Sequence, residues 1–279
     1  MRRSLLFIPG NNPGMLQSCD IFEADAVIFD LEDAVSTTEK DSARFLVTNY
    51  LKTYKPSLEV VVRINGFDTP FYQKDLNELL KLENLNTIML PKARVSDLIT
   101  LSKMIKDLNK NIKIIPIIEQ AISLIEVEEI ARFELVDGIL LGAEDYTKDL
   151  EVVRTKEGNE IFYARNRIIT ACKAYKIDAI DTPFTDTNDT EGLVKDTLFA
   201  KSIGMNAKSA IHPNQVESIN KLFTPTSKEI DYAQRVLIAR DEAFKKGLGV
   251  FSLDGKMVDK PVIERAEKVI EKAKKFGVL

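Results

Sequence analysis

The sequence contains very few of the residues on which histidine- and cysteine-based chemistry depends. Of its 279 residues, one is histidine, two are cysteine and none is tryptophan. A Ser-His-Asp triad, a histidine-ligated zinc site or a histidine general base would each depend on His212 alone. Cys19 and Cys172 form no CxxC pair, and so few thiols indicate a reducing compartment rather than a disulfide scaffold. Other residue types must therefore carry the chemistry.

Long apolar runs and a strong excess of one charge are also lacking. Lys and Arg total 39 against 43 Asp and Glu, a net charge of −4, and no basic block marks a nucleic-acid surface. No run approaches the roughly 18 apolar residues that a membrane span needs. The basic residues Arg2 and Arg3 precede an apolar run that Pro9 closes too early for a secretory signal. We expect a cytoplasmic protein that binds neither nucleic acid nor a membrane.

What the sequence does contain is an alternation of short apolar runs with segments of helical period. The apolar runs cover residues 5–8, 26–31, 60–64, 87–90, 112–118, 138–141, 179–180 and, more weakly, 207–211. Unbroken runs of this kind are typical of parallel strands that are covered on both faces. Eight of them within about 220 residues predict an α/β fold of the (β/α)8 TIM-barrel type. A doubly wound sheet is the alternative, but neither a GxGxxG nor a P-loop motif is present.

The residues after the eighth run exceed what a barrel needs. They predict a long helix over about 226–246, a glycine-rich stretch, and a last helix that starts at Pro261. We therefore expect two domains, a catalytic barrel at 1–223 and a C-terminal helical extension at 224–279 that serves as a lid or an oligomerisation arm. Within the extension, Leu253-Asp254-Gly255-Lys256 predicts a β-hairpin, because Asp-Gly suits a type I′ turn.

Ionisable side chains follow seven of the eight predicted strands. They are Asp30, Glu32 and Asp33; Arg63; Lys92; Glu119; Glu144 and Asp145; Asp181; and His212. The carboxyl ends of barrel strands carry the active site in this fold, so these groups are expected at one rim. Clustered carboxylates with almost no His or Cys favour a hard cation, which makes Mg²⁺ the expected metal.

Among these groups, Glu119 and Asp145 are the best candidate metal ligands, because each follows an uninterrupted strand run. Gly142 and Ala143 would let the backbone approach a ligand closely and offer N–H groups to a carboxylate. Arg63 is interpreted either as a fixed guanidinium at the rim or as the partner of a structural ion pair with the acidic residues after the second strand. For His212, a hydrogen-bonded rim residue and a substrate contact are equally compatible with the sequence.

Several motifs, in the same order along nearly the whole chain, resemble the citrate lyase β-chain family within the HpcH/HpaI aldolase superfamily. They are Arg3-Ser4-Leu5-Leu6-Phe7-Ile8-Pro9-Gly10, Phe29-Asp30-Leu31-Glu32-Asp33-Ala34-Val35, Val62-Arg63-Ile64-Asn65, Leu90-Pro91-Lys92, Leu141-Gly142-Ala143-Glu144-Asp145-Tyr146, Ile211-His212-Pro213-Asn214-Gln215 and Leu253-Asp254-Gly255-Lys256-Met257-Val258-Asp259. The resemblance implies a Mg²⁺-dependent carbon–carbon lyase that cleaves a citryl thioester on an acyl carrier protein to oxaloacetate and the acetyl thioester. It also implies citrate lyase α and γ (acyl carrier) chains as partners and a homo-oligomer, a trimer or a multiple of it.

The resemblance also implies a role for each matching residue. Glu119 and Asp145 resemble the Mg²⁺ ligands, and Arg63 matches the substrate-binding arginine. Glu32 and Asp33 match the acidic pair that supports the water shell of the metal. Gly142, Ala143 and Glu144 lie in the matching substrate-binding segment. Asp254 matches a position that, in CoA-dependent relatives, reaches into a neighbouring subunit's site as acid/base, whereas its spacing alone favours a turn residue.

Two alternatives remain open on the sequence. The first is another enzyme of the same superfamily, a stand-alone malyl-CoA or citramalyl-CoA lyase or a malyl-CoA thioesterase. The second is a protein of another class, a non-catalytic scaffold or a regulatory paralogue within a lyase complex. The presence of Arg63, Glu119 and Asp145 together argues against a decayed site.

Overall fold

The computed structural model describes residues 1–245 and 247–279, which form two compact units, Met1–Asn220 and Lys221–Leu279. The first unit is built on eight strands, β1 (Ser4–Pro9), β2 (Ala26–Asp30), β3 (Glu59–Arg63), β4 (Thr87–Leu90), β5 (Lys113–Ile118), β6 (Gly138–Leu141), β7 (Asp178–Asp181) and β8 (Ala207–Ala210). The strands follow one another in order and close into a parallel barrel when β8 pairs with β1. The predicted (β/α)8 barrel is thus confirmed.

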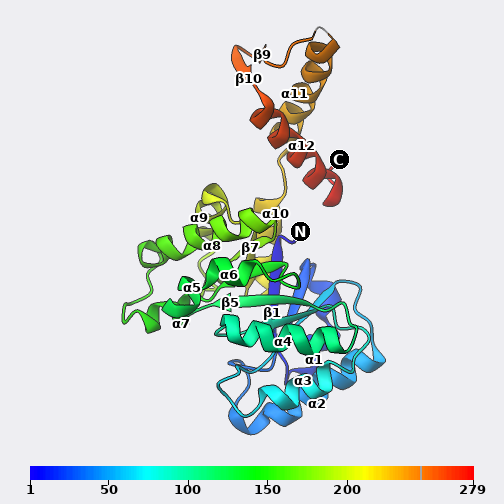
Figure 1. The fold of residues 1–279 in the computed structure, drawn as a ribbon, viewed down its shortest axis with the longest axis vertical. Coiled ribbons are helices and arrows are strands. Elements are labelled where there is room, and N and C mark those ends of the chain that lie inside the picture. Colours follow the sequence, from blue (N-terminus) through cyan, green and yellow to red (C-terminus); the bar gives the residue numbers. More distant parts are fainter. Residues whose placement is uncertain (246) are drawn as a thin grey trace. The chain divides into compact units, whose positions relative to one another are not determined.

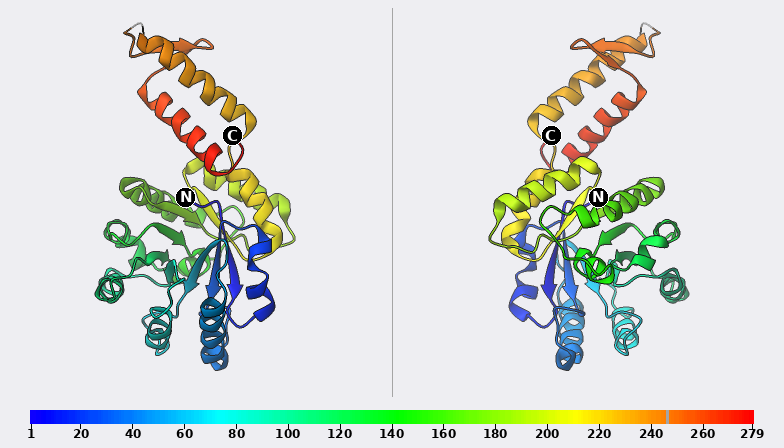
Figure 2. Two further views of the ribbon diagram at one scale, coloured as in Figure 1. Left: turned by 90° about the vertical axis from the view of Figure 1, so that its right-hand side faces the viewer. Right: turned by 90° about the vertical axis from the view of Figure 1, so that its left-hand side faces the viewer.

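Helices surround this barrel, as Figures 1 and 2 show for the first unit. They are α1 (Pro13–Gln17), α2 (Lys40–Thr53), α3 (Tyr72–Leu79), α4 (Val95–Asp107), α5 (Ala121–Ile125), α6 (Val127–Ala131), α7 (Ala143–Asp149), α8 (Phe162–Tyr175), α9 (Thr190–Ile203) and α10 (Val216–Phe223). The helical segment between β5 and β6 is broken in two at Glu126. The carboxylate of Glu126 there accepts hydrogen bonds from Arg94 and from the main chain of Val95, a tertiary contact that the helical period does not reveal.

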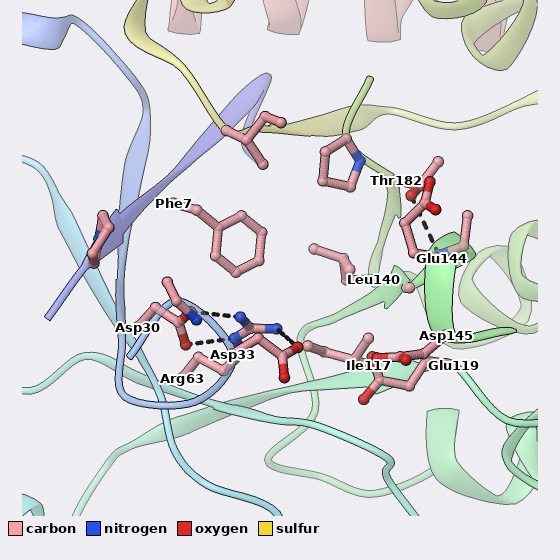
Figure 3. Close-up of a pocket in the computed structure, with 16 residues that line it drawn as sticks. Phe7, Asp30, Asp33, Arg63, Ile117, Glu119, Leu140, Glu144, Asp145 and Thr182 are labelled. Carbon is pink, nitrogen blue, oxygen red and sulfur yellow. Dashed lines mark hydrogen bonds and ion pairs between the residues drawn. The ribbon is translucent and has the colours of Figure 1, made fainter. Parts of the chain in front are cut away.

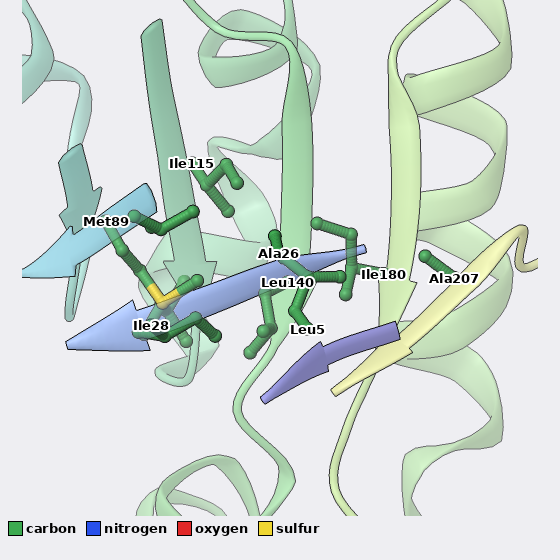
Figure 4. Close-up of a cluster of buried hydrophobic side chains, with 10 residues drawn as sticks. Leu5, Ala26, Ile28, Met89, Ile115, Leu140, Ile180 and Ala207 are labelled. Carbon is green, nitrogen blue, oxygen red and sulfur yellow. The ribbon is translucent and has the colours of Figure 1, made fainter. Parts of the chain in front are cut away.

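The barrel interior is filled by one layer of apolar side chains, shown in Figure 4. Alternate residues of the strands contribute to it: Leu5, Ala26, Ile28, Val61, Met89, Ile115, Ile117, Leu140, Ile180 and Ala207. The residues between them, such as Val27 and Phe29, are equally buried but point outward to the helices. Because side chains alternate along a strand, the residue two positions beyond each core residue points into the mouth of the barrel. This parity decides which strand-end residues can form a site.

The second unit consists of α11 (Ser227–Lys245), a hairpin of β9 (Phe251–Leu253) and β10 (Lys256–Val258), and α12 (Lys260–Lys275). Its core contains Ala233, Val236, Val258, Ile263 and Ala266. The predicted hairpin turn is confirmed, since Asp254 and Gly255 both have positive φ, 51° and 73°. In the part of the chain that the structure describes, no helix combines the length and the apolar character needed to cross a bilayer.

Candidate active site

A cavity of about 410 Å³ opens at the carboxyl ends of the barrel strands (Figure 3). Six of the positions that face the barrel mouth line it: Phe7, Asp30, Arg63, Glu119, Gly142 and Thr182. Each lies two residues beyond a member of the apolar core layer on the same strand. The parity of the strands therefore brings Arg63 and Glu119, two of the predicted site residues, into one chamber.

Three carboxylates surround the guanidinium of Arg63. Its Nε and Nη2 donate to the two carboxylate oxygens of Asp30 at 2.7 and 2.5 Å. Its Nη1 lies 3.1 Å from Glu32 Oε2 and 3.4 Å from Asp33 Oδ2. Burial by itself would lower the pKa of Arg63, but these charges outweigh it and raise that pKa. Both interpretations of Arg63 therefore hold, because it is ion-paired and it also lines the cavity.

Asp30 is the principal partner of Arg63, a role that the sequence did not assign to it. The register of β2 and β3 places the two residues directly opposite each other. Burial by itself would raise the pKa of the fully buried Asp30 carboxyl, but the Arg63 charge outweighs it and the pKa is lowered. Asp30 thus fixes the guanidinium of Arg63, a residue that lines the cavity.

Glu119 and Asp145 border the same chamber. Glu119 is 3 % exposed, and its Oε1 accepts a 2.6 Å hydrogen bond from the main-chain N–H of Lys92. Burial raises the pKa of Glu119 to about 7, against the opposing charge of Arg63 and with the help of the nearby Asp145 charge. A side chain at Gly142 would come within 2.7 Å of Glu119, so this position requires glycine. A bound cation would stabilise the charged form of Glu119, which burial and the nearby Asp145 carboxylate destabilise.

The acidic pair after β2 adds to the negative charge. Burial raises the pKa of Glu32 to about 8, because Arg63 only partly offsets it while Asp33, Glu119 and Asp30 add repulsion. Glu32 Oε2 is buried and makes no hydrogen bond, despite its 3.1 Å approach to Arg63. Glu32 therefore has an unused lone pair beside the chamber.

These carboxylates fit an open magnesium site rather than a closed metal cage. Among the described residues, no group of three His, Cys, Asp or Glu side chains is arranged to hold a metal ion by itself. Mg²⁺ typically takes one or two protein carboxylates and fills its other positions with water and substrate oxygens. Glu119 and Asp145, which both line the chamber, would supply such a pair.

The segment at the start of α7, which the sequence predicts to bind substrate, has some of its main-chain N–H groups engaged in internal hydrogen bonds. The N–H of Gly142 donates to Ile118 O, and the N–H of Ala143 donates to Thr182 Oγ1. The main-chain N–H groups of Glu144 and Asp145 donate to no other described residue. The main-chain donors left over for a ligand are therefore those of Glu144 and Asp145, two residues later than the Gly142 and Ala143 donors expected from the sequence.

Four of the strand-end residues do not line the chamber: Glu32, Lys92, Asp181 and His212. His212 is exposed, and its Nδ1 accepts from Asn214 N at the start of the 3-10 helix Pro213–Gln215, so it caps a turn. Asp181 follows Ile180 by one residue and therefore points away from the barrel interior. The rim position expected for Asp181 is wrong, because its side chain is fully buried between the barrel and the helices.

Asp181 belongs to a buried cluster of four charges behind the barrel wall. Lys208 Nζ donates to Asp181 Oδ2 and Asp196 Oδ2, each at 2.6 Å, and to Thr182 O at 2.7 Å. Arg165 donates to both carboxylates as well. The cluster is electrically balanced and holds Thr182, whose hydroxyl accepts from the first residue of α7.

We expect Lys208→Met to lower the free energy of unfolding by about 3–5 kcal/mol, because it leaves two buried carboxylates with one cation. Urea denaturation monitored by circular dichroism measures this loss. Lys106→Met, which removes an exposed ion pair with Glu134, serves as the control and should change stability little. Equal stability of the two variants would contradict the structural role given to the cluster.

Asp254 lies in the second unit, at the tip of the β9–β10 turn. Its side chain is half exposed, and Arg235 Nη1 donates to its Oδ2 at 2.6 Å. Asp254 is therefore both a turn residue and a member of an ion pair with α11.

Comparison with known proteins identifies the family. The HpcH/HpaI aldolase/citrate lyase family model matches residues 3–213. The chain belongs to this family. It is 44 % identical to citrate lyase subunit beta of Leuconostoc mesenteroides subsp. cremoris over 98 % of this chain and 93 % of that protein. It is 28 % identical to citramalyl-CoA lyase of Rattus norvegicus over 96 % and 85 %.

Among solved structures, protein CitE from Mycobacterium tuberculosis, in complex with magnesium, acetoacetate and coenzyme A, matches with a TM-score of 0.82. It shares 30 % sequence identity, and the match covers 97 % of each chain. The resemblance read from the motifs is thereby confirmed for the family and for the barrel with its C-terminal extension.

Proposed function

We propose that this protein is a Mg²⁺-dependent carbon–carbon lyase that cleaves a citryl thioester to oxaloacetate and an acetyl thioester, as the β subunit of a citrate lyase. The observation that carries the proposal is the chamber that the Arg63 guanidinium, fixed by Asp30, lines together with the carboxylates of Glu119 and Asp145. The 44 % identity to a citrate lyase subunit beta, against 28 % to a citramalyl-CoA lyase, favours the citryl substrate. The presence of Arg63, Glu119 and Asp145 together in the chamber argues against a non-catalytic scaffold.

In this proposal Glu119 and Asp145 hold Mg²⁺, and the magnesium complex of the 30 % identical CitE supports the assignment. The bound cation supplies Lewis acidity toward the hydroxyl and carboxylate oxygens of the citryl group. Asp33 and Glu32 lie beside Arg63 and would order the remaining water ligands. The hydrogen bond from the main-chain N–H of Lys92 to Oε1 fixes the direction of the Glu119 carboxylate.

The protein residues then supply positioning and proton transfer. Arg63, immobilised by Asp30, stabilises negative charge that develops on the substrate as the carbon–carbon bond breaks. The free main-chain N–H groups of Glu144 and Asp145 would bind a substrate carboxylate. Since Nδ1 of His212 accepts a hydrogen bond as a cap, we assign the hydroxyl proton to a carboxylate of the chamber or to a bound water.

The proposed setting is a cytoplasmic lyase complex. The citryl group would arrive on an acyl carrier γ chain, with the α chain as a further partner and with homo-oligomers, trimers or a multiple, as the assembly. The unit Lys221–Leu279 would serve as the lid or oligomerisation arm. The subunit-beta relatives support this setting.

A substrate panel tests the function. Purified protein is assayed with citryl, malyl and citramalyl thioesters, each on acyl carrier protein and on CoA, with Mg²⁺ and with a chelator. We expect fastest cleavage of the citryl thioester on the carrier protein, and loss of that cleavage on chelation. A clear preference for malyl- or citramalyl-CoA would replace the citryl assignment, and no cleavage of any substrate would favour a scaffold.

For the second unit, we propose Asp254 as an acid/base group and expect Asp254→Asn to reduce turnover about 10²-fold. Asparagine tolerates the left-handed backbone at this position, so the hairpin should persist. Turnover and circular dichroism check the two expectations. Asp231→Asn, which removes the other carboxylate paired with Arg235, is the control. Full activity of Asp254→Asn would leave Asp254 as a turn residue only.

A further inference from the structure

Lys40, the first residue of α2, is a buried lysine that faces the back of the acidic turn after β2. The residue is 8 % exposed. Its Nζ donates to Leu31 O at 2.9 Å and to Glu32 O at 2.6 Å. None of the ion pairs among the described residues includes Lys40. Burying an ammonium group without a carboxylate partner costs desolvation free energy, which the two carbonyl contacts of Lys40 partly offset.

The two carbonyls that Lys40 binds, those of Leu31 and Glu32, belong to the turn that follows β2. Asp30 accepts hydrogen bonds from the N–H groups of Glu32 and Ala34, at 2.8 and 2.9 Å. Lys40 binds the carbonyls of the same turn. Two buried charges of opposite sign thus hold the donors and the acceptors of one short segment, and the main chain of Glu32 is bound through both its N–H and its C=O.

The position of this segment determines where the Glu32 and Asp33 carboxylates lie relative to Arg63. Glu32 and Asp33 approach the same guanidinium nitrogen, at 3.1 and 3.4 Å. Unlike Asp30, which the β2–β3 register places opposite Arg63, these two residues lie beyond the strand and depend on the turn for their position. The Lys40 ammonium group, which binds two carbonyls of this turn, therefore helps to place the Glu32 and Asp33 carboxylates beside Arg63.

We propose that Lys40 is a positioning residue for this active site, which holds the turn 30–35 so that Glu32 and Asp33 face Arg63 and the metal-binding carboxylates. The inference rests on the proposed function and deepens it, since Lys40 itself touches neither substrate nor metal. Loosening the turn displaces the two carboxylates, and misplacement of reacting groups by about 1 Å costs about 10²-fold in rate.

Lys40→Met tests the role, because methionine keeps the unbranched apolar stem and removes the ammonium. Lys110→Met is the matched control, since Lys110 is a half-buried lysine whose Nζ donates to a main-chain carbonyl, Leu82 O, at 2.7 Å away from the chamber. We expect kcat of Lys40→Met to fall about 10²-fold, with KM for the thioester within about threefold. The Mg²⁺ concentration for half-activation should rise. Lys110→Met should match the wild type in all three.

A binding measurement separates this inference from the proposed function. Calorimetry with oxaloacetate in the presence of Mg²⁺ requires no turnover, and Lys40→Met should bind at least about tenfold more weakly than Lys110→Met. If the wild type cleaves no citryl thioester, the proposed function fails, and this comparison still decides the role of Lys40. Wild-type kcat and wild-type oxaloacetate affinity in a folded Lys40→Met would overturn the inference.

Two further variants keep the test decisive. Should Lys40→Met not fold, Lys40→Gln retains one N–H donor without the charge and should show the same loss of kcat and of affinity. Lys40→Arg keeps a cationic donor that can reach both carbonyls, and it should recover at least about a tenth of wild-type kcat. A Lys40→Gln with wild-type kinetics would reduce Lys40 to an ordinary helix-start residue and overturn the proposal.

Discussion

Glu119→Gln and Asp145→Asn are each expected to abolish Mg²⁺-dependent cleavage without unfolding the chain. Glutamine has the shape of glutamate, and its amide oxygen can still accept the hydrogen bond from Lys92 N. It lacks the charge that a hard cation needs from its protein ligands. Turnover measured across a Mg²⁺ titration should remain below about 10⁻³ of the wild-type rate at every concentration. Glu134→Gln, which removes an exposed carboxylate in the loop after α6, is the control and should retain full activity.

Glu119→Gln should also change the pH dependence of the stability of the metal-free protein. The folded-state pKa of Glu119, about 7, lies above its ordinary value of 4.5, so the folded metal-free protein binds the proton more tightly than the unfolded chain. Its contribution to stability is therefore present at low pH and is lost as the pH rises from about 4.5 to about 7. Glu119→Gln should remove this part of the pH dependence and raise the melting temperature at pH 8.

Magnesium should raise the melting temperature of the wild type. Binding to the folded state alone raises the melting temperature in proportion to the logarithm of the free metal concentration. We expect this shift for the wild type and for Glu134→Gln, and none for Glu119→Gln or Asp145→Asn. A normal Mg²⁺ shift together with normal turnover in either ligand variant would remove that residue from the metal site.

The sequence was sufficient to predict the barrel and several groups in its mouth. Eight apolar runs of strand length alternate with helical segments, and this rhythm survives in β1 to β8. Arg63 and Glu119 were placed at strand ends, and both line the cavity. The family motifs then distinguished these residues from ordinary helix caps, which strand-end carboxylates usually are.

The parity of the strands was not predictable. Glu119 and Asp181 both end apolar runs, yet one faces the chamber and the other the helices. Strands that are buried on both faces have no polar alternation to show which residues point inward. The core layer, in which Ile117 and Ile180 both point inward, is needed to tell the two carboxylates apart.

Contacts between distant segments were hidden for a related reason. The pairing of Asp30 with Arg63 follows from the register of two strands, and register is fixed by the closed barrel rather than by either strand alone. The carbonyl contacts of Lys40 depend on how deeply the first turn of α2 packs, whereas a lysine at a helix start is usually exposed. Buried charges that support a site are therefore found only once the packing is known.

Arg63→Ala is expected to reduce turnover by at least about 10³-fold, since loss of a single preorganised donor to a developing anion already costs about 10²–10³-fold. Arg63 is the one cationic side chain among the described residues that line the 410 Å³ cavity. Arg63→Lys keeps the charge but loses the planar fork that grips Asp30 through two nitrogens. It should recover only a small part of the rate.

A loss of rate in Arg63→Ala has two possible origins, because the change also leaves the fully buried Asp30 without its cation. Removing both partners of a buried ion pair is far less destabilising than removing one. The double variant Asp30→Asn with Arg63→Ala should therefore regain much of the stability that Arg63→Ala loses, as measured by urea denaturation, while its turnover stays as low. Recovery of turnover together with stability would show that Arg63 only neutralises Asp30, and the guanidinium would then have no direct part in stabilising the reacting groups.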